Sequence, residues 1–280
     1  MNNFGTGAKS TSDVFLLLLF LFITFSISWF IIGSYIFFPV SMRHYFGDIN
    51  GAHPLFFLAT WAPAIAAFIV IFVYRGFSGI YAFLSRLLLW RCSIYSWLVI
   101  LLVLPLVFIF GSLIKGGGII TNVEPHGWSS LVVLLFMMLF LGPVEEFGWR
   151  GFAQPILQRY LTPLSTGLLI GFLWGVWHLP AFYLAGTVFA DWQFLPFFIG
   201  NITLAVLVTP LFNASKGSLL LPMMFHWQLI NPFWPDAQPW DTWLLVVITF
   251  IIFLFGKHFF LDHSSAVKRV LPETASVSDL

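Results

Sequence analysis

Charged residues are scarce in this sequence. Lys, Arg, Asp and Glu together supply 8% of the 280 residues, whereas about 25% is usual in soluble domains. Hydrophobic residues supply 60%, and Phe alone occurs 35 times. A soluble fold cannot bury that much apolar surface, so the composition excludes a soluble globular protein and predicts lipid as the solvent for most of the chain. The formal net charge of +1 offers no basic surface, so we expect no nucleic-acid partner.

Cysteine is rarer still, because Cys92 is the single one in the chain. This excludes an intramolecular disulfide and a cysteine-based metal site. Cys92 stands beside Arg91 near a predicted membrane border, where reversible acylation is one interpretation. A structural cysteine is the interpretation that we favour.

Long apolar runs account for most of the remaining composition. Each of eight runs approaches the roughly 20 residues that cross a bilayer as a helix, at about residues 14–38, 54–74, 95–114, 129–147, 164–186, 194–213, 217–234 and 241–260. The runs are continuous rather than alternating, which disfavours a β-barrel. The first is too long for a signal peptide and is predicted to be a retained helix. The predicted fold class is therefore all-α, a polytopic membrane helix bundle of about eight transmembrane helices in residues 1–260, with a polar cytoplasmic tail in residues 261–280 whose last stretch is expected to be disordered.

The distribution of basic residues predicts the orientation. With the N-terminus inside and eight crossings, ten of the twelve Lys and Arg residues fall on the inner side, in agreement with the positive-inside rule. The inner set is Lys9, Arg75, Arg86, Arg91, Arg150, Arg159, Lys216, Lys257, Lys268 and Arg269, and the outer set is Arg43 and Lys115. We therefore predict an N-in, C-in topology. The basic, amphipathic segment at residues 75–92 is expected to lie along the inner membrane surface.

Ionisable residues within apolar runs are costly unless they are paired or hydrated, so each marks a candidate functional position. The first cluster is "EEFGWR", residues 145–150. On a helix Glu146 and Arg150 are four positions apart with the acid first, the favourable order for an ion pair. Glu145 has Trp149 at the corresponding position and stays available as a general base. A charged helix end anchored at the interface is the alternative interpretation.

The second cluster is "GFLWGVWHLPAFYL", residues 171–184. Trp174 and His178 are four positions apart and share a helix face. Pro180 is expected to kink or end this helix and to free backbone carbonyls. A functional His178 is favoured over a hydrogen-bonded core histidine.

The third cluster is "GSLLLPMMFHWQLINPF", residues 217–233, with His226 inside the run and Asn231 five residues later. Polar contacts between helices are the alternative interpretation for both side chains. Taken together, the three clusters offer a carboxylate base, two imidazoles, a guanidinium and an amide. Such a set can activate a water molecule and stabilise an oxyanion, which is the chemistry of hydrolysis.

Metal binding is a separate hypothesis. His178, His226 and a glutamate are a possible zinc ligand set. However, the sequence lacks His-Glu-x-x-His spacing, and Arg150 beside the acids opposes a cation. We therefore expect no metal and no other cofactor.

The three clusters resemble the motifs of the CPBP family, which groups type II CAAX prenyl endopeptidases with bacteriocin-processing and immunity proteins. "EEFGWRG", "GFLWGVWHLP" and "GSLLLPMMFHWQLIN" carry the resemblance in this order, over about residues 129–235. It implies an intramembrane peptidase that acts on a peptide or a lipidated protein substrate. The partners expected are therefore the lipid bilayer and such a substrate, and the expected location is the plasma membrane of a bacterial cell.

The resemblance also implies roles for single residues. Glu145 matches the water-activating glutamate of the family, which works with the histidine matched by His178. Glu146 and Arg150 match the second acid and the arginine of the first motif, which support the site. His226 matches the histidine that helps an asparagine to bind the oxyanion.

Two features of the sequence conflict with a simple transfer of these roles. The family asparagine stands four residues after the histidine, whereas Asn231 is five residues after His226 and faces about 140° away on an ideal helix. Asn231 reaches the site only if the helix is bulged or has ended. In addition, straight spans put Glu145 near the inner face and His178 roughly 20 Å into its own span. They meet only if the fifth span starts later or the fourth lies deeper.

Three functions remain open at this stage. The leading one is an endopeptidase that opens towards the cytoplasm. The second is a non-catalytic membrane scaffold or a bacteriocin-immunity-type protein that binds a peptide through the same groove. A transporter with a proton-relay acid is the third, disfavoured because no internal repeat is evident.

Overall fold

The protein is mainly helical in the part described by a computed structural model, residues 11–120 and 127–272. No β-strand occurs in those two ranges, which confirms the all-α fold class. The α-helices are α1 (Thr11–Phe37), α2 (Pro39–Phe46), α3 (Pro54–Thr60), α4 (Ala62–Leu84), α5 (Ile94–Leu98), α6 (Leu104–Ile114), α7 (Gly127–Met138), α8 (Gln154–Leu157), α9 (Pro163–His178), α10 (Phe194–Ala214), α11 (Leu220–Leu229), α12 (Trp240–Phe255) and α13 (Lys257–Leu261). Short 3₁₀ or π segments are η1 (Ser85–Leu88), η2 (Val99–Val103), η3 (Phe147–Ala153), η4 (Leu179–Tyr183), η5 (Val188–Asp191) and η6 (His263–Ser265).

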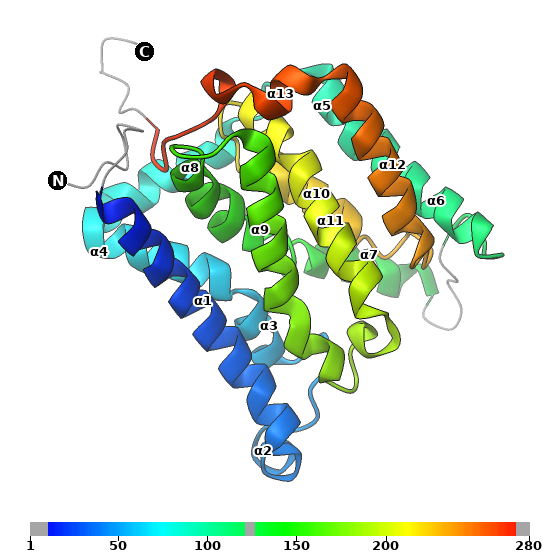
Figure 1. Cartoon of the computed structure of the whole chain (residues 1–280). Helices are drawn as coiled ribbons and strands as arrows, with labels where there is room; N and C mark the ends of the chain where they lie inside the picture. The colour runs from blue at the N-terminus through cyan, green and yellow to red at the C-terminus, as the bar shows by residue number, and fades with distance from the viewer. Residues whose placement is uncertain (1–10, 121–126, 273–280) are drawn as a thin grey trace.

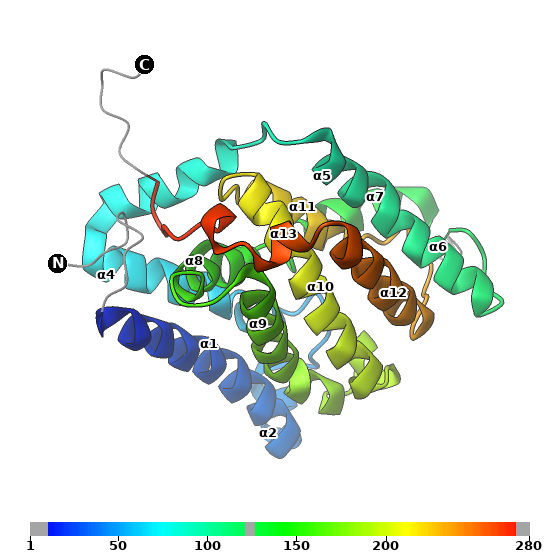
Figure 2. The same cartoon turned by 45° about the horizontal axis from the view of Figure 1, so that its top comes forward.

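Helices α9 and α10 run side by side through the centre of the bundle, with α1 and α4 on one side and α12 and α6 on the other (Figures 1 and 2). Gly167 and Gly171 of α9 permit this close packing. A Cβ at Gly171 would lie 2.5 Å from the Cα of Ile202, and one at Gly167 would lie 2.8 Å from the Cα of Val206. Small residues spaced four apart are the usual means by which membrane helices bring their backbones together.

Five helical stretches are long and apolar enough to cross a membrane, and they overlap five of the eight predicted runs. These are Ser12–Phe37, Ala62–Leu88, Ile94–Ile114, Pro163–Tyr183 and Phe194–Ala214. The second run, predicted at 54–74, is divided into α3 and a longer stretch that extends to Leu88. Two shorter apolar helices, α7 and α12, belong to the fourth and eighth runs. The polytopic membrane bundle is thus confirmed, but the expectation of eight continuous helices needs correction.

The fourth run shows the largest correction. α7 ends at Met138, turns follow, and the chain becomes helical again through Glu145, η3 and α8 as far as Leu157. The predicted helix over 129–147 is therefore broken inside and ends about ten residues further on. Pro143 explains the break, because the residue before a proline is disfavoured in helical geometry. As a result Glu145 begins the second helical stretch instead of standing near the end of one straight span, and its contact with Trp174 on α9 removes the conflict of depth with His178.

The seventh run is also shorter than predicted. α11 spans Leu220–Leu229 rather than residues 217–234. Pro232 accounts for the early end, since it disfavours helical geometry at Asn231. The fifth run behaves as predicted at its end, where α9 stops at His178 and the 3₁₀ segment η4 contains Pro180.

Both ends of the described chain pack into the same end of the bundle (Figure 1). Asp13 at the start of α1 forms a buried ion pair with Arg159, at 2.6 Å, and Arg159 also donates to the carbonyl of Lys268. Val270 is 0% exposed. Packing therefore continues beyond the domain boundary expected at residue 260. The end of the expected tail, after residue 272, lies outside the described residues, as does Lys9.

The basic segment at residues 75–92, which begins inside α4, differs from the surface helix that was expected. Gly76 has φ +60° and ψ −159°, so α4 is kinked there. Beyond the kink Phe83 and Arg86 are buried, at 0% and 3% exposure. The basic residue at position 86 is thus inside the protein and not in the interfacial layer.

Candidate active site

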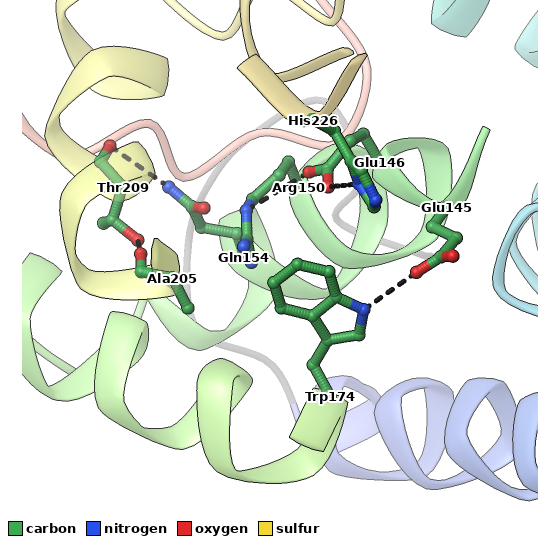
Figure 3. Close-up of polar contacts among 8 residues, drawn as sticks. All are labelled: Glu145, Glu146, Arg150, Gln154, Trp174, Ala205, Thr209 and His226. Atoms are coloured by element: carbon green, nitrogen blue, oxygen red, sulfur yellow. Dashed lines mark hydrogen bonds and ion pairs between the residues drawn. The ribbon is translucent and has the colours of Figure 1, made fainter. Parts of the chain in front are cut away.

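The candidate site is built on the stretch that begins with the turn after α7 and continues into η3 (Figure 3). Glu145 and Glu146 precede the π-helical η3, and both side chains are buried. Single π-helical turns inside helices are found mostly at functional positions. Gly148 seats η3 against α4, because a Cβ there would lie 2.5 Å from the carbonyl oxygen of Pro63. The two carboxylates are therefore carried by a tightly packed element.

Glu146 has two partners. Its Oε1 accepts a hydrogen bond from Nδ1 of His226 at 2.8 Å. Its Oε2 lies 3.3 Å from Nε of Arg150, so the predicted ion pair four residues apart is present. The contact with His226 joins η3 to α11, two elements 80 residues apart in sequence. It was not anticipated from the sequence.

Glu145 has a different environment. Its Oε2 accepts a hydrogen bond from the indole Nε1 of Trp174 at 2.8 Å (Figure 3). Trp174 comes from α9, so this contact joins the first and second sequence motifs. The role of Trp174 was missed in the sequence, although its position four residues before His178 placed it on the same helix face. Its indole now forms the centre of the site.

His178 lies next to Trp174 on α9. Its Nδ1 donates to the backbone carbonyl of Trp174 at 2.8 Å. A histidine that donates from Nδ1 carries the lone pair of the neutral ring on Nε2. The ring is half-buried, with the ring centroids of Trp177 at 4.7 Å and Phe197 at 5.1 Å. The ring of Trp174 is 5.6 Å from His178 and 5.3 Å from His226, so one indole separates and orients both imidazoles.

Arg150 is buried inside the protein. The topology predicted from the sequence had instead counted it among the basic residues on the inner side of the membrane. Arg150 is 1% exposed, and its guanidinium carbon lies 5.7 Å from the centre of the Trp174 ring. Two ionised glutamates and one guanidinium would leave one negative charge in this buried cluster. Because buried charge is costly without a partner, the hydrogen bonds that Trp174 and His226 donate to the two carboxylates stabilise the cluster.

Gly142 shapes the space beside His226. A Cβ at this position would lie 2.6 Å from Nε2 of His226 and 2.9 Å from its Cδ2. Any residue larger than glycine would therefore collide with the imidazole. The absence of a side chain lets the turn after α7 pack directly against His226.

Asn231 stands just after the end of α11. Its Nδ2 donates to Oε1 of Gln228 at 3.1 Å, and its Oδ1 accepts from the backbone N–H of Phe233 at 3.0 Å. The helix has ended before Asn231, as the five-residue spacing required. Its contacts stabilise the turn after the helix, and its expected role in oxyanion binding stays a prediction.

The described residues hold no group of three or more His, Cys, Asp and Glu side chains arranged for a metal ion. His226 uses Nδ1 for Glu146, and Arg150 lies on the other side of the same carboxylate. The expectation of a cofactor-free site remains a prediction for experiment.

Comparison with known proteins agrees with the motifs. The family described as "Type II CAAX prenyl endopeptidase Rce1-like" matches residues 127–231, a range that contains all six candidate residues. The resemblance to this family is confirmed. A similar protein is "CAAX prenyl protease 2" from Methanococcus maripaludis, which is 28% identical over 182 residues, or 59% of this chain and 67% of that protein. The matched Rce1-like region begins with α7 and ends at Asn231, so the buried Arg86 and the segment around Val270 lie outside it.

Proposed function

We propose that this protein is an intramembrane endopeptidase that hydrolyses a peptide bond in a membrane-associated, prenylated substrate. The observation that supports this best is the separation of partners between two adjacent buried glutamates. Glu146 is held by His226 and Arg150, whereas Glu145 has a single neutral donor, Trp174. Only Glu145 keeps an oxygen, Oε1, available for a water molecule. The similarity to CAAX prenyl proteases points to the same chemistry.

The first step in this mechanism is activation of water. Glu145 Oε1 takes one proton from the water, and the oxygen attacks the carbonyl carbon of the scissile peptide bond. Trp174 holds the other oxygen of the carboxylate, so the acceptor oxygen has a fixed direction. Nε2 of His178 supplies a second proton acceptor close to the same indole. A general base placed in this way contributes typically 10²–10⁴-fold in rate.

The second step is collapse of the tetrahedral intermediate. His226, protonated and held through Nδ1 by Glu146, directs its Nε2–H to the oxyanion, and the close packing of Gly142 against the ring fixes the position of this donor. A preorganised donor of this kind is worth on the order of 10²–10³ in rate. The carbon–nitrogen bond then breaks, and the proton taken up by Glu145 passes to the leaving amine. The products are a carboxylic acid and an amine, with one water consumed.

The decisive experiment compares the wild type with Glu145→Gln in bilayer discs. Prenylated and unmodified peptides of one sequence are offered together, and products are identified by mass spectrometry. We expect cleavage of the prenylated peptide by the wild type and at least about 10²-fold slower cleavage by Glu145→Gln. Asp48→Asn is the matched control, because Asp48 is exposed and outside the site. Equal rates for Glu145→Gln and the wild type would contradict the mechanism.

The same assay with a chelator tests the metal-free mechanism. We expect no loss of activity, because Arg150 and His226 occupy the carboxylate that a cation would need. Loss of cleavage that is restored by zinc would instead assign the histidines to a metal. Binding of the prenylated peptide without cleavage by the wild type would favour the scaffold function.

A further inference from the structure

Arg86 is a buried cation whose partners are unusual. It is 3% exposed, and no Asp or Glu among residues 11–120 and 127–272 forms an ion pair with it. Its partners are three backbone carbonyls and the faces of Phe83 and Phe212, at 5.6 and 5.3 Å. A buried charge costs several kcal/mol unless its surroundings compensate for it. The retention of an arginine here therefore needs a structural explanation.

The three carbonyls belong to three separate segments. Arg86 Nη1 donates to the carbonyl of Gly151 in η3 at 2.9 Å, and Nε donates to that of Gly217 at 2.7 Å. Gly151 follows Arg150 directly, and Gly217 lies three residues before α11, the helix that carries His226. The backbone carbonyl of Arg86 also accepts from the N–H of Leu219 at 3.1 Å. One residue thus connects the two elements that meet in the bond between Glu146 and His226.

The segments around Arg86 fit closely. A Cβ on Gly151 would lie 2.6 Å from Cζ of Phe83 and 2.9 Å from Cδ2 of Leu219. Gly217 has φ +86°, a conformation that glycine adopts without strain. Both glycines let their carbonyls approach the guanidinium, and neither segment can shift without losing a hydrogen bond.

The third carbonyl belongs to a C-terminal strap, residues 266–271, which passes close to α8 (Figure 2). Arg86 Nη1 donates to the carbonyl of Val270 at 2.8 Å. The strap is bound through backbone hydrogen bonds and through the buried side chains of Val270 and Leu271. Gln158 donates to the carbonyl of Val267 at 2.8 Å, and Asn213 accepts from the N–H of the same residue at 3.1 Å. The strap therefore supplies the third carbonyl that Arg86 binds.

We propose that Arg86 is a positioning residue for the candidate active site. It fixes η3 against the start of α11, and so keeps Glu146 and His226 in contact, while the strap holds its guanidinium in place. Its effect on turnover rests on the proposed function, whereas its effect on the contact between Glu146 and His226 does not. Arg86 lies outside the region that matches the Rce1-like family.

The test uses the full chain in bilayer discs and two substitutions. Arg86→Met removes the side-chain donors and keeps an unbranched apolar stem, and Arg86→Lys keeps the charge but cannot reach three carbonyls at once. The matched control is Asp13→Asn combined with Arg159→Met. It removes another buried arginine that binds the strap, through the carbonyl of Lys268, and ties it to α1. Folding of each variant is checked by circular dichroism and gel filtration.

The first readout needs no substrate. Protein labelled with ¹⁵N-histidine gives ring nitrogen signals, and His226→Gln identifies those of His226. We expect both Arg86 variants to move the His226 signals at constant pH, Arg86→Met more than Arg86→Lys, while the control leaves them in place. Unchanged His226 signals in folded Arg86→Met would overturn the proposal. If Arg86→Met does not fold, unchanged signals in Arg86→Lys would do the same.

The second readout is hydrolysis of the prenylated peptide. We expect Arg86→Met to lower kcat by roughly tenfold or more with little change in KM, because a misplacement of about 1 Å can cost about 10²-fold. If Arg86→Met shifts the His226 signals but keeps the kcat of the wild type, the effect of Arg86 on turnover is overturned and its effect on the position of His226 stands. Absence of hydrolysis by the wild type would overturn the proposed function and leave the signals of His226 to decide the positioning.

Discussion

At the scale of single residues, the site separates two chemically identical side chains by their partners. Glu145 and Glu146 are neighbours in sequence and both are buried, yet they point to different elements (Figure 3). One binds the indole of Trp174 on α9, and the other binds the imidazole of His226 on α11. Pairs of titratable groups in contrasting environments are the usual basis for dividing acid and base roles.

The indole N–H of Trp174 gives the first prediction. Trp174→Phe keeps an aromatic ring beside both histidines but removes the donor to Glu145. A hydrogen bond to a charged group contributes about 1.5–3 kcal/mol, so we expect kcat to fall by roughly 10- to 100-fold. Peptide hydrolysis measured over a range of substrate concentrations tests this. Trp177→Phe is the matched control, because that indole donates to Ser28. An equal loss in both variants would contradict the specific role.

Gly142 gives the second prediction. In Gly142→Ala the new methyl carbon would lie 2.6 Å from Nε2 of His226, which is too close for two atoms that are not bonded. We expect the imidazole to move and kcat to fall by about 10-fold or more, since oxyanion donors need correct placement. Gly33→Ala is the control, because its nearest neighbour would lie at 3.9 Å. Full activity of Gly142→Ala would show that the position of the His226 ring is not critical for hydrolysis.

At the scale of elements, the close contact of α9 with α10 fixes where His178 and Trp174 lie. Gly171→Ala would put a Cβ 2.5 Å from the backbone of Ile202. Overpacking of this kind typically costs 1–3 kcal/mol, and we expect a lower midpoint of thermal unfolding in detergent. Gly51→Ala, which has nothing within 4 Å, is expected to leave the midpoint unchanged. Equal midpoints for the two variants would contradict the importance of this contact.

The fourth apolar run shows what sequence patterns miss at this scale. Hydropathy is an average over many residues, so it located the run but not the turns between Met138 and Glu145. The break depends on local chemistry, Gly142 followed by Pro143, and on the packing of η3 against α4. Because depth in the membrane follows from helix ends, the error at residue 147 produced the false separation of Glu145 from His178.

At the scale of the whole molecule, much of the architecture could be predicted. Composition and run length led to the helical membrane bundle, and motif order led to the three elements of the site. Arg86 could not be predicted, because its burial depends on carbonyls 65, 131 and 184 residues away in sequence. The local sequence pattern predicted instead that Arg86 lies at the inner membrane surface. The hydrogen bond from Trp174 to Glu145 was missed for the same reason, since the two residues are 29 apart.

The predicted orientation can be measured with the single cysteine. We expect a membrane-impermeant maleimide to label Cys92 in inside-out vesicles but not in intact cells. Burial raises the pKa of the Cys92 thiol, so less thiolate is present at neutral pH and the labelling rate should rise with pH. The variant Cys92→Ser with Gly51→Cys should show the opposite accessibility. Labelling of Cys92 from outside intact cells would reverse the topology.

The strap has a consequence for the order in which the protein is made. Translation proceeds from the N-terminus, so Arg86 is synthesised 184 residues before the carbonyl of Val270, and Arg159 is synthesised 109 residues before that of Lys268. Until those late residues leave the ribosome, both cations lack the carbonyl that the strap supplies, although Asp13 is already available to Arg159. The nascent chain thus passes through a stage in which every motif of the site is present but its support is unfinished. Assembly of the site is in this way timed to the end of synthesis of the strap.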